Sequence, residues 1–425
     1  MFLSIRNTGK ISSAEIEISG ITVMAGVNNT GKSTIGKVLF CLFNSFYRIE
    51  QQIRQERITK IGWIITSAYQ AAANRIPREV DLYTFAATYI FEHKASYRNS
   101  AYLIVDLKNL YIEGDKSAEK YLSNDFLSEV SEKIMQILDV SDEEIFVTVL
   151  QRRLQGEFNM QINSIYRPGL QSEIALKIKN KEVNISIIDN EYITIENNFS
   201  LETEVIYLDD PLVLDDTRSF ELGSHRDHLK ANLSKRDKAP SVKDAIEQAV
   251  ASKKLETVLA QMNKVCKGKL VRKPNSTRYA VEYREGDLET ALDIKNLSTG
   301  MKAFAILKTL LLNGSLEENG IIILDEPEIH LHPEWQLRFA ETIVLLQKEY
   351  SLHILLNTHS PYFLEAIEVY SHKYGVSNKC KYYLAEDNGT IASITDVTNK
   401  IEKIYEQLAG PLQDLEDMRY PDDTH

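Results

Sequence analysis

The sequence predicts an α/β protein with mixed sheets and a helical insertion. Three observations support this prediction. Short apolar runs near the N-terminus lead through a glycine-rich turn into a helical stretch, as in a strand, loop and helix. A long middle segment has apolar residues at helical spacing. In the last third, two apolar runs end in acidic or polar residues, which is typical of buried strands in a parallel sheet.

Along the chain, two head segments are expected to enclose an insertion. Residues 1–50 and 200–425 are expected to form the head, residues 51–143 a helical insertion, and residues 144–200 a β-rich segment that joins the head. The strands and helices expected within these segments follow the apolar periodicity. They are strands within 2–25, 174–195, 205–208 and 278–283, helices over 32–50, 242–262 and 400–408, and a hairpin within 381–394.

The composition is typical of a globular intracellular chain. Hydrophobic residues make up 43% of the 425 residues, which allows a sizeable core. The net charge of −12 argues against a protein held on nucleic acid by bulk charge alone. Cys41, Cys266 and Cys380 are too far apart for a zinc motif or disulfide framework, so a reducing compartment, the cytoplasm, is expected. We expect neither a signal peptide nor a membrane span.

A phosphate-binding loop is predicted at residues 26–34, GVNNTGKST. Gly26, Gly31, Lys32 and Ser33 have the spacing of the P-loop, directly after an apolar strand and at the start of a helix. Glycines let backbone N–H groups point at phosphate oxygens, and the helix N-terminus favours negative charge. The lysine is expected on the β- and γ-phosphates and the serine hydroxyl on Mg²⁺.

An acidic pair follows the apolar run 321–324. Asp325 would stand at the carboxyl end of a buried strand, the edge at which open α/β sheets bind ligands. Its expected role is to hold Mg²⁺ directly or through water. Glu326 is the expected general base that orients the attacking water.

A second anion site is predicted at the start of the helix that follows LSTGMK, residues 297–302. Ser298 is expected to cap this helix, and a serine at a helix N-terminus can bind an anion. The simple alternative is a cap alone. Since the P-loop begins another helix, the second site would require a different nucleotide, such as that of a facing subunit.

Three histidines follow the two apolar runs of the last third. His359 ends the run HILLNT and is expected beside the γ-phosphate, where an imidazole can donate to a phosphate oxygen. His330 and His332 are two residues apart after Glu326. They could suggest a metal pair, but a role in shaping the loop is favoured because neither a cysteine nor a third histidine is nearby in sequence.

Together these motifs resemble the ABC-type ATPase heads of the SMC, RecF and OLD group. GVNNTGKST, LSTGMK, IIILDEPEIHLHP and LLNTHSPYFLEAIE occur in the family order, and DEPEIHLHP is similar to the OLD-like branch. The resemblance implies an ABC-type P-loop NTPase head in which two copies sandwich two ATP molecules. It also implies roles for the following residues: Gly26, Asn29, Gly31, Lys32, Ser33 and Thr34 on phosphate and Mg²⁺, Asp325 on the metal, Glu326 as base, Ser298 and Gly300 in trans, and His359 as the γ-phosphate switch. Gln151 and Gln155 remain open candidates for the glutamine loop.

The resemblance leads us to expect a homodimer or higher even oligomer that hydrolyses ATP with Mg²⁺. The segment after His359 is short and offers no clustered carboxylates on a rigid scaffold, so a nuclease domain in this chain is not expected. The chain resembles Septu- and PARIS-type ATPases. This favours a sensor subunit of an anti-phage system that controls a separate effector such as a nuclease, with residues 50–143 and the C-terminal tail as partner surfaces.

Two alternatives remain open at this stage. A RecF-like ATPase that clamps DNA would require a basic surface, which residues 225–238 and 264–278 could supply. Nucleic acid is therefore a possible but not a required partner. The second alternative is an ATP-locked scaffold with slow turnover.

Overall fold

The computed structural model describes residues 1–73, 80–97, 99–114, 116–215, 223–235, 245–272, 281–286 and 290–419. The chain folds as two compact units. One consists of Met1–Phe46 and Leu150–His425, and the other of Tyr47–Val149. We call them the head and the helical unit.

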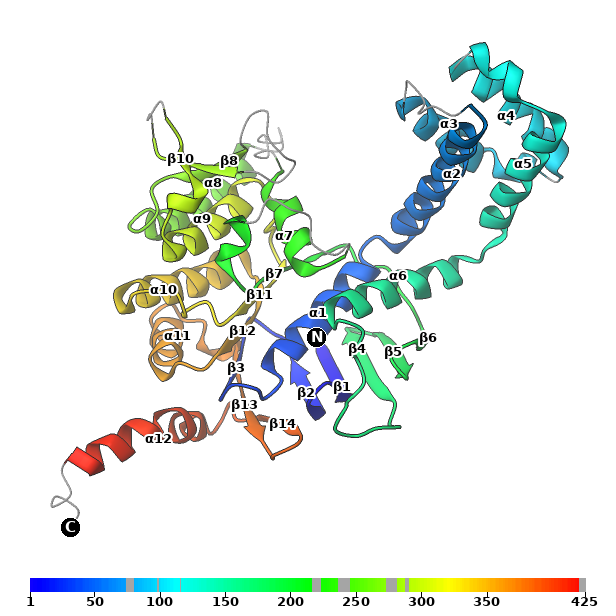
Figure 1. The fold of residues 1–425 in the computed structure, drawn as a ribbon. Helices are drawn as coiled ribbons and strands as arrows, with labels where there is room; N and C mark the ends of the chain where they lie inside the picture. The colour runs from blue at the N-terminus through cyan, green and yellow to red at the C-terminus, as the bar shows by residue number, and fades with distance from the viewer. Residues whose placement is uncertain are drawn as a thin grey trace. The chain divides into compact units, whose positions relative to one another are not determined.

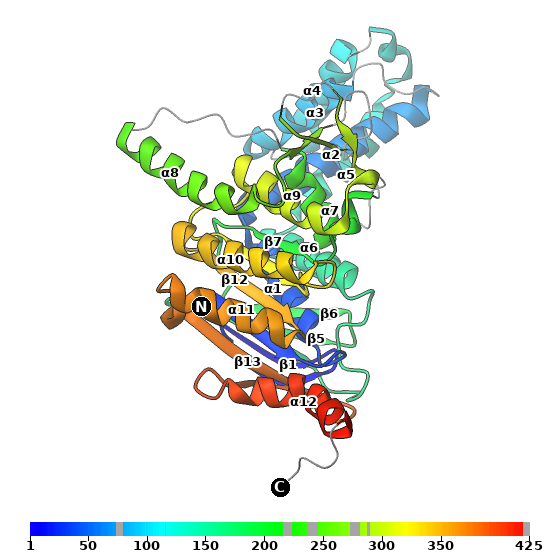
Figure 2. The same ribbon diagram turned by 90° about the vertical axis from the view of Figure 1, so that its left-hand side faces the viewer.

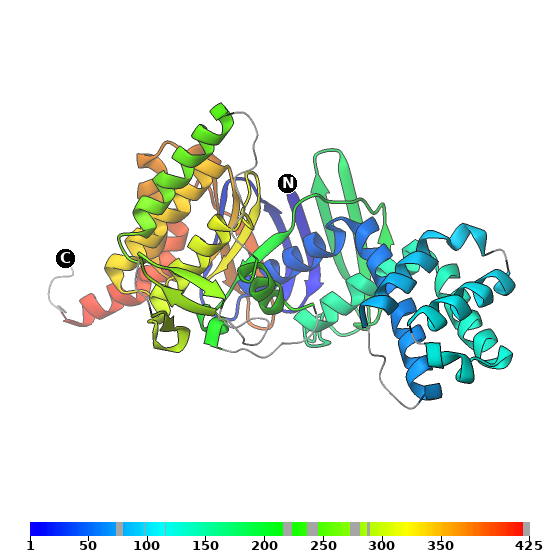
Figure 3. The ribbon, with the colours of Figure 1, turned by 90° about the horizontal axis from the view of Figure 1, so that it is seen from above.

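An eleven-stranded mixed sheet, counted over the described residues, runs through the head. Its five strands from β13 to β7 are parallel, and antiparallel pairs β1–β2, β1–β4, β4–β5 and β5–β6 extend the other end (Figures 1 and 3). In spatial order the strands are β6 (Tyr192–Glu196), β5 (Lys181–Ile188), β4 (Ser172–Ile178), β1 (Phe2–Thr8), β2 (Ile11–Glu17), β14 (Ala392–Asp396), β13 (Cys380–Asp387), β3 (Ile21–Gly26), β12 (His353–Thr358), β11 (Ile321–Asp325) and β7 (Val205–Leu208).

Helices cover both faces of the parallel strands, as their continuous apolar sequences require. In Figures 1 and 2, α9, α10 and α11 follow one another along one side, and Figure 1 shows α1 on the other side of β3 and β12. The bounds of the helices around the parallel strands are α1 (Lys32–Phe46), α9 (Thr299–Leu312), α10 (Pro333–Tyr350), α11 (Pro361–Lys373) and α12 (Glu402–Arg419).

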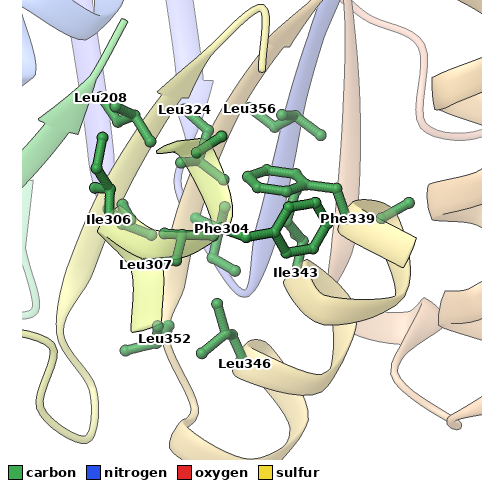
Figure 4. Packing of buried hydrophobic residues seen from close by; sticks show 14 of the residues in the cluster. Leu208, Phe304, Ile306, Leu307, Leu324, Phe339, Ile343, Leu346, Leu352 and Leu356 are labelled. Atoms are coloured by element: carbon green, nitrogen blue, oxygen red, sulfur yellow. The ribbon is translucent and has the colours of Figure 1, made fainter. Parts of the chain in front are cut away.

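The core of the head lies between the parallel strands and the helices α9 and α10. Phe304 of α9 meets Phe339 of α10 edge to face, with ring centroids 5.1 Å apart (Figure 4). Leu324 and Leu356, from neighbouring strands, are fully buried beside them. Burying one such side chain contributes about 1.5–3 kcal/mol, so this packing holds the strand ends in place.

A smaller antiparallel sheet and two further helices complete the head. The sheet has the order β10 (Leu292–Asp293), β9 (Val281–Arg284) and β8 (Lys269–Arg272). Helix α7 (His225–Leu233) packs on β7, and α8 (Ala245–Met262) packs against α10. Short 3₁₀ turns occur in the head at Pro211–Asp215, Ile294–Asn296 and Ser377–Lys379.

The helical unit has a core of its own. Ile61, Leu103 and Ile134 are fully buried in it, and the Tyr111 hydroxyl donates to the Ile65 carbonyl oxygen at 2.9 Å. Its elements are α2 (Ile49–Ala73), α3 (Val80–Glu92), α4 (Ser100–Gly114), α5 (Asn124–Asp139), the 3₁₀ turns Lys94–Ser96 and Lys116–Tyr121, and the first part of α6 (Asp142–Glu157).

The mixed α/β fold with a helical insertion, predicted from the sequence, is confirmed. Two local expectations were wrong. The helix expected over 32–50 is two helices, because the first ends at Phe46 and Arg48 has a left-handed backbone conformation with a φ of 44°. The segment 144–200, expected to be β-rich, begins in α6 and becomes a meander only at Ser172. Residues 278–280, the first part of the strand expected over 278–283, and residues 242–244 of the helix expected over 242–262 lie outside the described residues. Within the described ranges, none of the helices is long and apolar enough to cross a membrane.

Candidate active site

The glycine-rich loop joins β3 to α1 in a conformation that two of its glycines make possible. Gly26 and Gly31 have φ values of 154° and 83°, and Asn29, between them, has a φ of 64°. A Cβ at Gly31 would lie 2.7 Å from Cγ1 of Ile11, and one at Gly26 would lie 2.4 Å from the Ala385 carbonyl oxygen. Both positions are therefore restricted to glycine by conformation and by space.

Lys32 folds back over this loop. Its side chain is only 4% exposed, and Nζ donates to the carbonyl oxygens of Gly26 at 2.9 Å and Val27 at 2.8 Å. Burial lowers the pKa of Lys32, and the nearby Glu326 carboxylate partly offsets this effect. The next residues begin α1, with Ser33 exposed and the Thr34 amide donating to the Gly31 carbonyl oxygen at 3.0 Å.

Asp325 ends β11 and is held by both neighbouring strands. The Tyr207 hydroxyl, from β7, donates to Asp325 Oδ2 at 2.7 Å, and Asn357 Nδ2, from β12, donates to Oδ1 at 2.8 Å. The residue is 8% exposed. Burial and the Asp325 carboxylate both raise the pKa of Tyr207. The carboxylate is thus fixed in direction at the carboxyl edge of the sheet.

Glu326 turns its side chain from β11 toward the phosphate loop. It has a φ of 50°, and its amide donates to the Asn357 carbonyl oxygen at 2.9 Å. Its Oε1 lies 3.8 Å from Lys32 Nζ and 3.3 Å from His359 Nδ1. The base, the lysine and the histidine that the sequence predicted therefore meet at one place.

Glu328 forms hydrogen bonds with Thr358 and with the backbone amide of His359. Its Oε1 accepts from the Thr358 hydroxyl at 2.5 Å and from the His359 amide at 3.3 Å. Only 3% of the side chain is exposed, and burial raises the pKa of Glu328. The sequence predicts no role for Glu328, because the order of residues in DEPE does not show which carboxylate faces inward.

The segment LSTGMK, residues 297–302, contains the start of α9, as the sequence predicted. Ser298 is exposed, and its side chain accepts from the Met301 amide at 3.4 Å. Gly300 is buried, and a Cβ there would lie 3.0 Å from the Trp335 ring and 3.2 Å from the His330 carbonyl oxygen. The hydroxyl and the helix N-terminus face outward, so a ligand of another molecule could reach them.

His330 and His332 belong to the loop between β11 and α10. His332 caps α10, where Nδ1 accepts from the Glu334 amide at 3.4 Å. Among the described residues, no group of three or more histidine, cysteine, aspartate or glutamate side chains is placed to hold a metal ion. The contact of His332 supports a loop-shaping role for that residue.

A polar cavity of about 430 Å³ opens beside Ser33 and Asp325. Its walls include a cluster that the sequence did not reveal, in which His225 Nδ1 lies 2.8 Å from Glu157 Oε2 and Nε2 lies 3.0 Å from Asp209 Oδ2. Burial by itself lowers the pKa of His225, but the two carboxylates outweigh it and raise the pKa to about 9. Asp209 directly follows the apolar strand β7, much as Asp325 follows the apolar run 321–324, and this is the one signal that could have identified this cluster.

The two glutamines considered for the glutamine loop lie elsewhere. Gln151 and Gln155 are on α6, and Gln155 Nε2 donates to the Asn190 carbonyl oxygen at 3.2 Å, at the turn between β5 and β6. Neither is among the residues that line the cavity beside Asp325.

A family model described as an AAA ATPase domain matches residues 1–364. Two curated relatives match over shorter stretches. The Old nuclease of Escherichia phage P2 is 35% identical over 98 residues, which is 23% of this chain and 15% of the relative. The Retron Vc95 probable ATPase of Vibrio cholerae serotype O1 biovar El Tor is 29% identical over 133 residues, which is 28% of this chain and 24% of the relative. The matched part is thus less than a quarter of either relative.

Among solved structures, an SMC head bound to the C-terminal winged-helix domain of ScpA matches 93% of this chain and 97% of its own. The TM-score is 0.42 and the sequence identity 12%.

Proposed function

The chain belongs to the AAA ATPase domain family, and we propose that it binds and hydrolyses ATP at sites completed by a second copy. The observation that supports this proposal is the meeting of Lys32, Glu326 and His359. Lys32 lies at the end of the loop that follows β3, and Glu326 and His359 directly follow β11 and β12, so all three lie at one edge of neighbouring parallel strands. A phosphate-binding lysine, a base and a histidine at one edge suit the transfer of a phosphoryl group to water.

The phosphate loop would bind the nucleotide through backbone and side chain together. The contacts of Lys32 with two loop carbonyl oxygens would give way to contacts with phosphate, because a cationic donor binds an anionic oxygen more strongly than a neutral one. We assign phosphate and metal contacts to the residues that the resemblance indicated. They are Gly26, Asn29, Gly31, Lys32, Ser33 and Thr34.

The residues at the cavity fit a magnesium ion. Ser33 and Asp325 line the same cavity, and both offer the hard oxygen ligands that Mg²⁺ prefers. The chemistry supplied by the ion is neutralisation of phosphate charge. The contacts with Tyr207 and Asn357 fix the Asp325 carboxylate, so it is already oriented before a ligand arrives.

Glu326 is assigned as the general base. Its carboxylate is 24% exposed and can reach a water molecule placed beside the γ-phosphate. His359, 3.3 Å away, can donate to a phosphate oxygen and so couple the base to the state of the nucleotide. Glu328 holds the backbone of His359 in place through the amide.

Ser298 and Gly300 are assigned to the nucleotide of a facing copy. The exposed helix N-terminus at Ser298 is an anion site, and the close packing of Gly300 on Trp335 sets its direction. The active species would then be a homodimer or a larger even assembly.

The direct test is ATP binding by Lys32→Met, with Lys308→Met as a matched control. Lys308 is also a buried lysine that donates to carbonyl oxygens, of Cys266 at 3.2 Å and Lys267 at 2.7 Å. Only the first variant should lose binding of a fluorescent ATP analogue. Equal loss in both variants, or binding that persists in Lys32→Met, would refute the site.

For the cell, we propose that this ATPase is the regulatory subunit of an anti-phage defence complex and controls a separate effector, such as a nuclease. The likeness to a retron ATPase and to a phage nuclease supports this proposal. So does the helical unit, whose Trp63, Phe85 and Tyr102 side chains are 61%, 62% and 65% exposed and could serve as partner contacts. Cytoplasmic location is proposed with it, since all three cysteines are free.

Purification of the chain together with the product of the adjacent gene tests this role. The proposal expects an effector that binds the wild-type chain and is released or activated when the ATP state changes. A recombination protein as the bound partner would favour a DNA-repair role in its place.

The contacts of α7 do not favour the DNA-clamping alternative. Arg226 donates to Asp209 at 2.6 Å, and His228 and Lys235 both contact Glu204, at 2.8 and 3.1 Å. The side chains of Arg226 and Lys235 are therefore paired with acidic groups of this chain. A slow-turnover scaffold differs from the proposed ATPase only in rate, and steady-state phosphate release by the wild-type chain decides between them.

A further inference from the structure

We propose that Asp209 is an outer ligand of the divalent cation at Ser33 and Asp325, which holds a cation-bound water through its carboxylate. The inference rests on the proposed function, because it requires a metal–nucleotide complex at the phosphate loop. It assigns a role to a residue that neither the motifs nor the comparisons indicated.

The position of Asp209 follows from the strand register. β7 and β11 are parallel neighbours, and Leu208 pairs with Leu324. The next residues along the two strands are Asp209 and Asp325, so both lie at the carboxyl edge of the sheet. Neighbouring strands are about 4.8 Å apart, a spacing that a water molecule can bridge between two carboxylates and a cation.

Asp209 lines two cavities. Asp209 lines the cavity of about 430 Å³ together with Ser33 and Asp325. It also lines a small cavity of about 30 Å³ together with Asp325 and Glu326. The small cavity has room for one water molecule, since about 10–15 Å³ is enough.

The two carboxylate oxygens of Asp209 differ in their hydrogen-bond partners. Arg226 donates to Oδ2 from Nε at 3.0 Å and from a terminal nitrogen at 2.6 Å, and His225 Nε2 is 3.0 Å from the same atom. Oδ1 is buried and has no hydrogen-bond partner among the described residues. A buried carboxylate oxygen without a donor is costly, which indicates that a water molecule belongs there.

The cluster also links Asp209 to Asp325. The His225 ring stacks on Tyr207, with centroids 4.4 Å apart, and the Tyr207 hydroxyl donates to Asp325. One rigid set of contacts thus orients both carboxylates. Mg²⁺ commonly keeps several waters and takes one or two carboxylates beside the phosphates, so an outer carboxylate suits it.

The competing account is that Asp209 only anchors α7 through Arg226 and His225. The two accounts predict opposite changes in cation affinity when Arg226 is replaced by a neutral residue. Removing the Arg226 charge leaves the Asp209 carboxylate more negative in its surroundings, which favours a cation nearby. If Asp209 were only an anchor, losing either partner would disturb the site in the same direction.

The experiment measures Mn²⁺ affinity by electron paramagnetic resonance, with the full-length chain saturated with a non-hydrolysable ATP analogue. Asp209→Asn should weaken Mn²⁺ binding about 10–100-fold, as is usual for outer ligands. Arg226→Gln should make it tighter by about twofold or more. Binding of the analogue in EDTA should be the same in the wild-type chain and Asp209→Asn, since the phosphate loop is intact.

Two outcomes would overturn the inference. They are an unchanged Mn²⁺ affinity in Asp209→Asn, and an equal loss in Asp209→Asn and Arg226→Gln. If Asp209→Asn does not fold, the change in Mn²⁺ affinity of Arg226→Gln decides alone. Tighter binding supports the inference, and unchanged or weaker binding overturns it. A wild-type chain that binds no ATP analogue, with or without metal, would refute the proposed function itself. If the analogue binds normally and Asp209→Asn has an unchanged Mn²⁺ affinity, only this inference is refuted.

Discussion

At the scale of single residues, Glu326 shows how the backbone aims the base. A glutamate with a φ of 50° is in the left-handed region, which costs on the order of 1–3 kcal/mol for such residues. The amide bond to the Asn357 carbonyl oxygen helps to hold this conformation. Without it, the side chain would follow the line of β11 instead of turning toward Lys32 and His359.

Glu326→Gln should bind ATP but hydrolyse it on the order of 10²–10⁴-fold more slowly, because an amide cannot accept the proton of the attacking water. ATP-bound dimers should therefore accumulate, as measured by light scattering after size exclusion. Glu334→Gln, in the first turn of α10, is the control and should hydrolyse ATP like the wild-type chain. Normal turnover in Glu326→Gln would contradict the assignment of the base.

His225 makes stability depend on pH. Its pKa is raised from 6.5 to about 9, so its contribution is fully present below pH 6.5 and is lost as the pH rises toward 9. His225→Gln should therefore lower the free energy of unfolding by about 3 kcal/mol at pH 6 and by much less at pH 9.5. Thermal unfolding at several pH values measures this, with exposed His372→Gln as the control. A destabilisation independent of pH would contradict the charged His225.

The sequence could predict only those site residues that carry a local signal. Lys32 and Asp325 sit at the junctions of a strand with a loop, which is visible in the order of residues. Tyr207 is 118 residues from the carboxylate it binds, and Glu157 is 68 residues from His225. Nothing in the residues themselves marks such pairs, because tertiary packing alone brings them together.

At the scale of elements, the start of α9 has two roles that one substitution can separate. Aspartate caps a helix as well as serine does, but its charge would repel a phosphate. Ser298→Asp should thus keep stability within about 0.5 kcal/mol yet lose ATP-driven association. The matched control is Ser123→Asp, because Ser123 caps α5 through the Phe126 amide. Association that survives in Ser298→Asp would leave α9 with capping alone.

The elements themselves were largely predictable where periodicity was strong. The apolar runs of β3, β11 and β12 and the amphipathic pattern of α8 correspond to elements of the structure. The break after Phe46 was missed because residues 32–50 keep helical spacing across it, and only the left-handed Arg48 reveals it. The pairing of β14 with β2 also has no local signal.

At the scale of the whole molecule, composite sites predict rescue between two inactive variants. A Lys32→Met copy lacks a working phosphate loop but offers Ser298, and a Ser298→Asp copy has the opposite defect. A mixed dimer holds one intact site. An equal mixture of the two should recover about a quarter of wild-type ATPase activity if half of the dimers are mixed and the sites act independently. Failure of the mixture to exceed either variant alone, with mixed dimers verified by two tags, would refute the shared site.

The order of strands also sets when this site can form during synthesis. β3, which leads into the phosphate loop, pairs on one side with β12 and on the other with β13, through Ile21–Ile354 and Ile21–Cys380. Ribosomes add about 5–20 residues per second, so β3 waits on the order of half a minute for its neighbours. The helical unit, whose core is local in sequence, can be folded by then. A nascent chain is therefore unable to bind ATP until β12 and β13 have been translated.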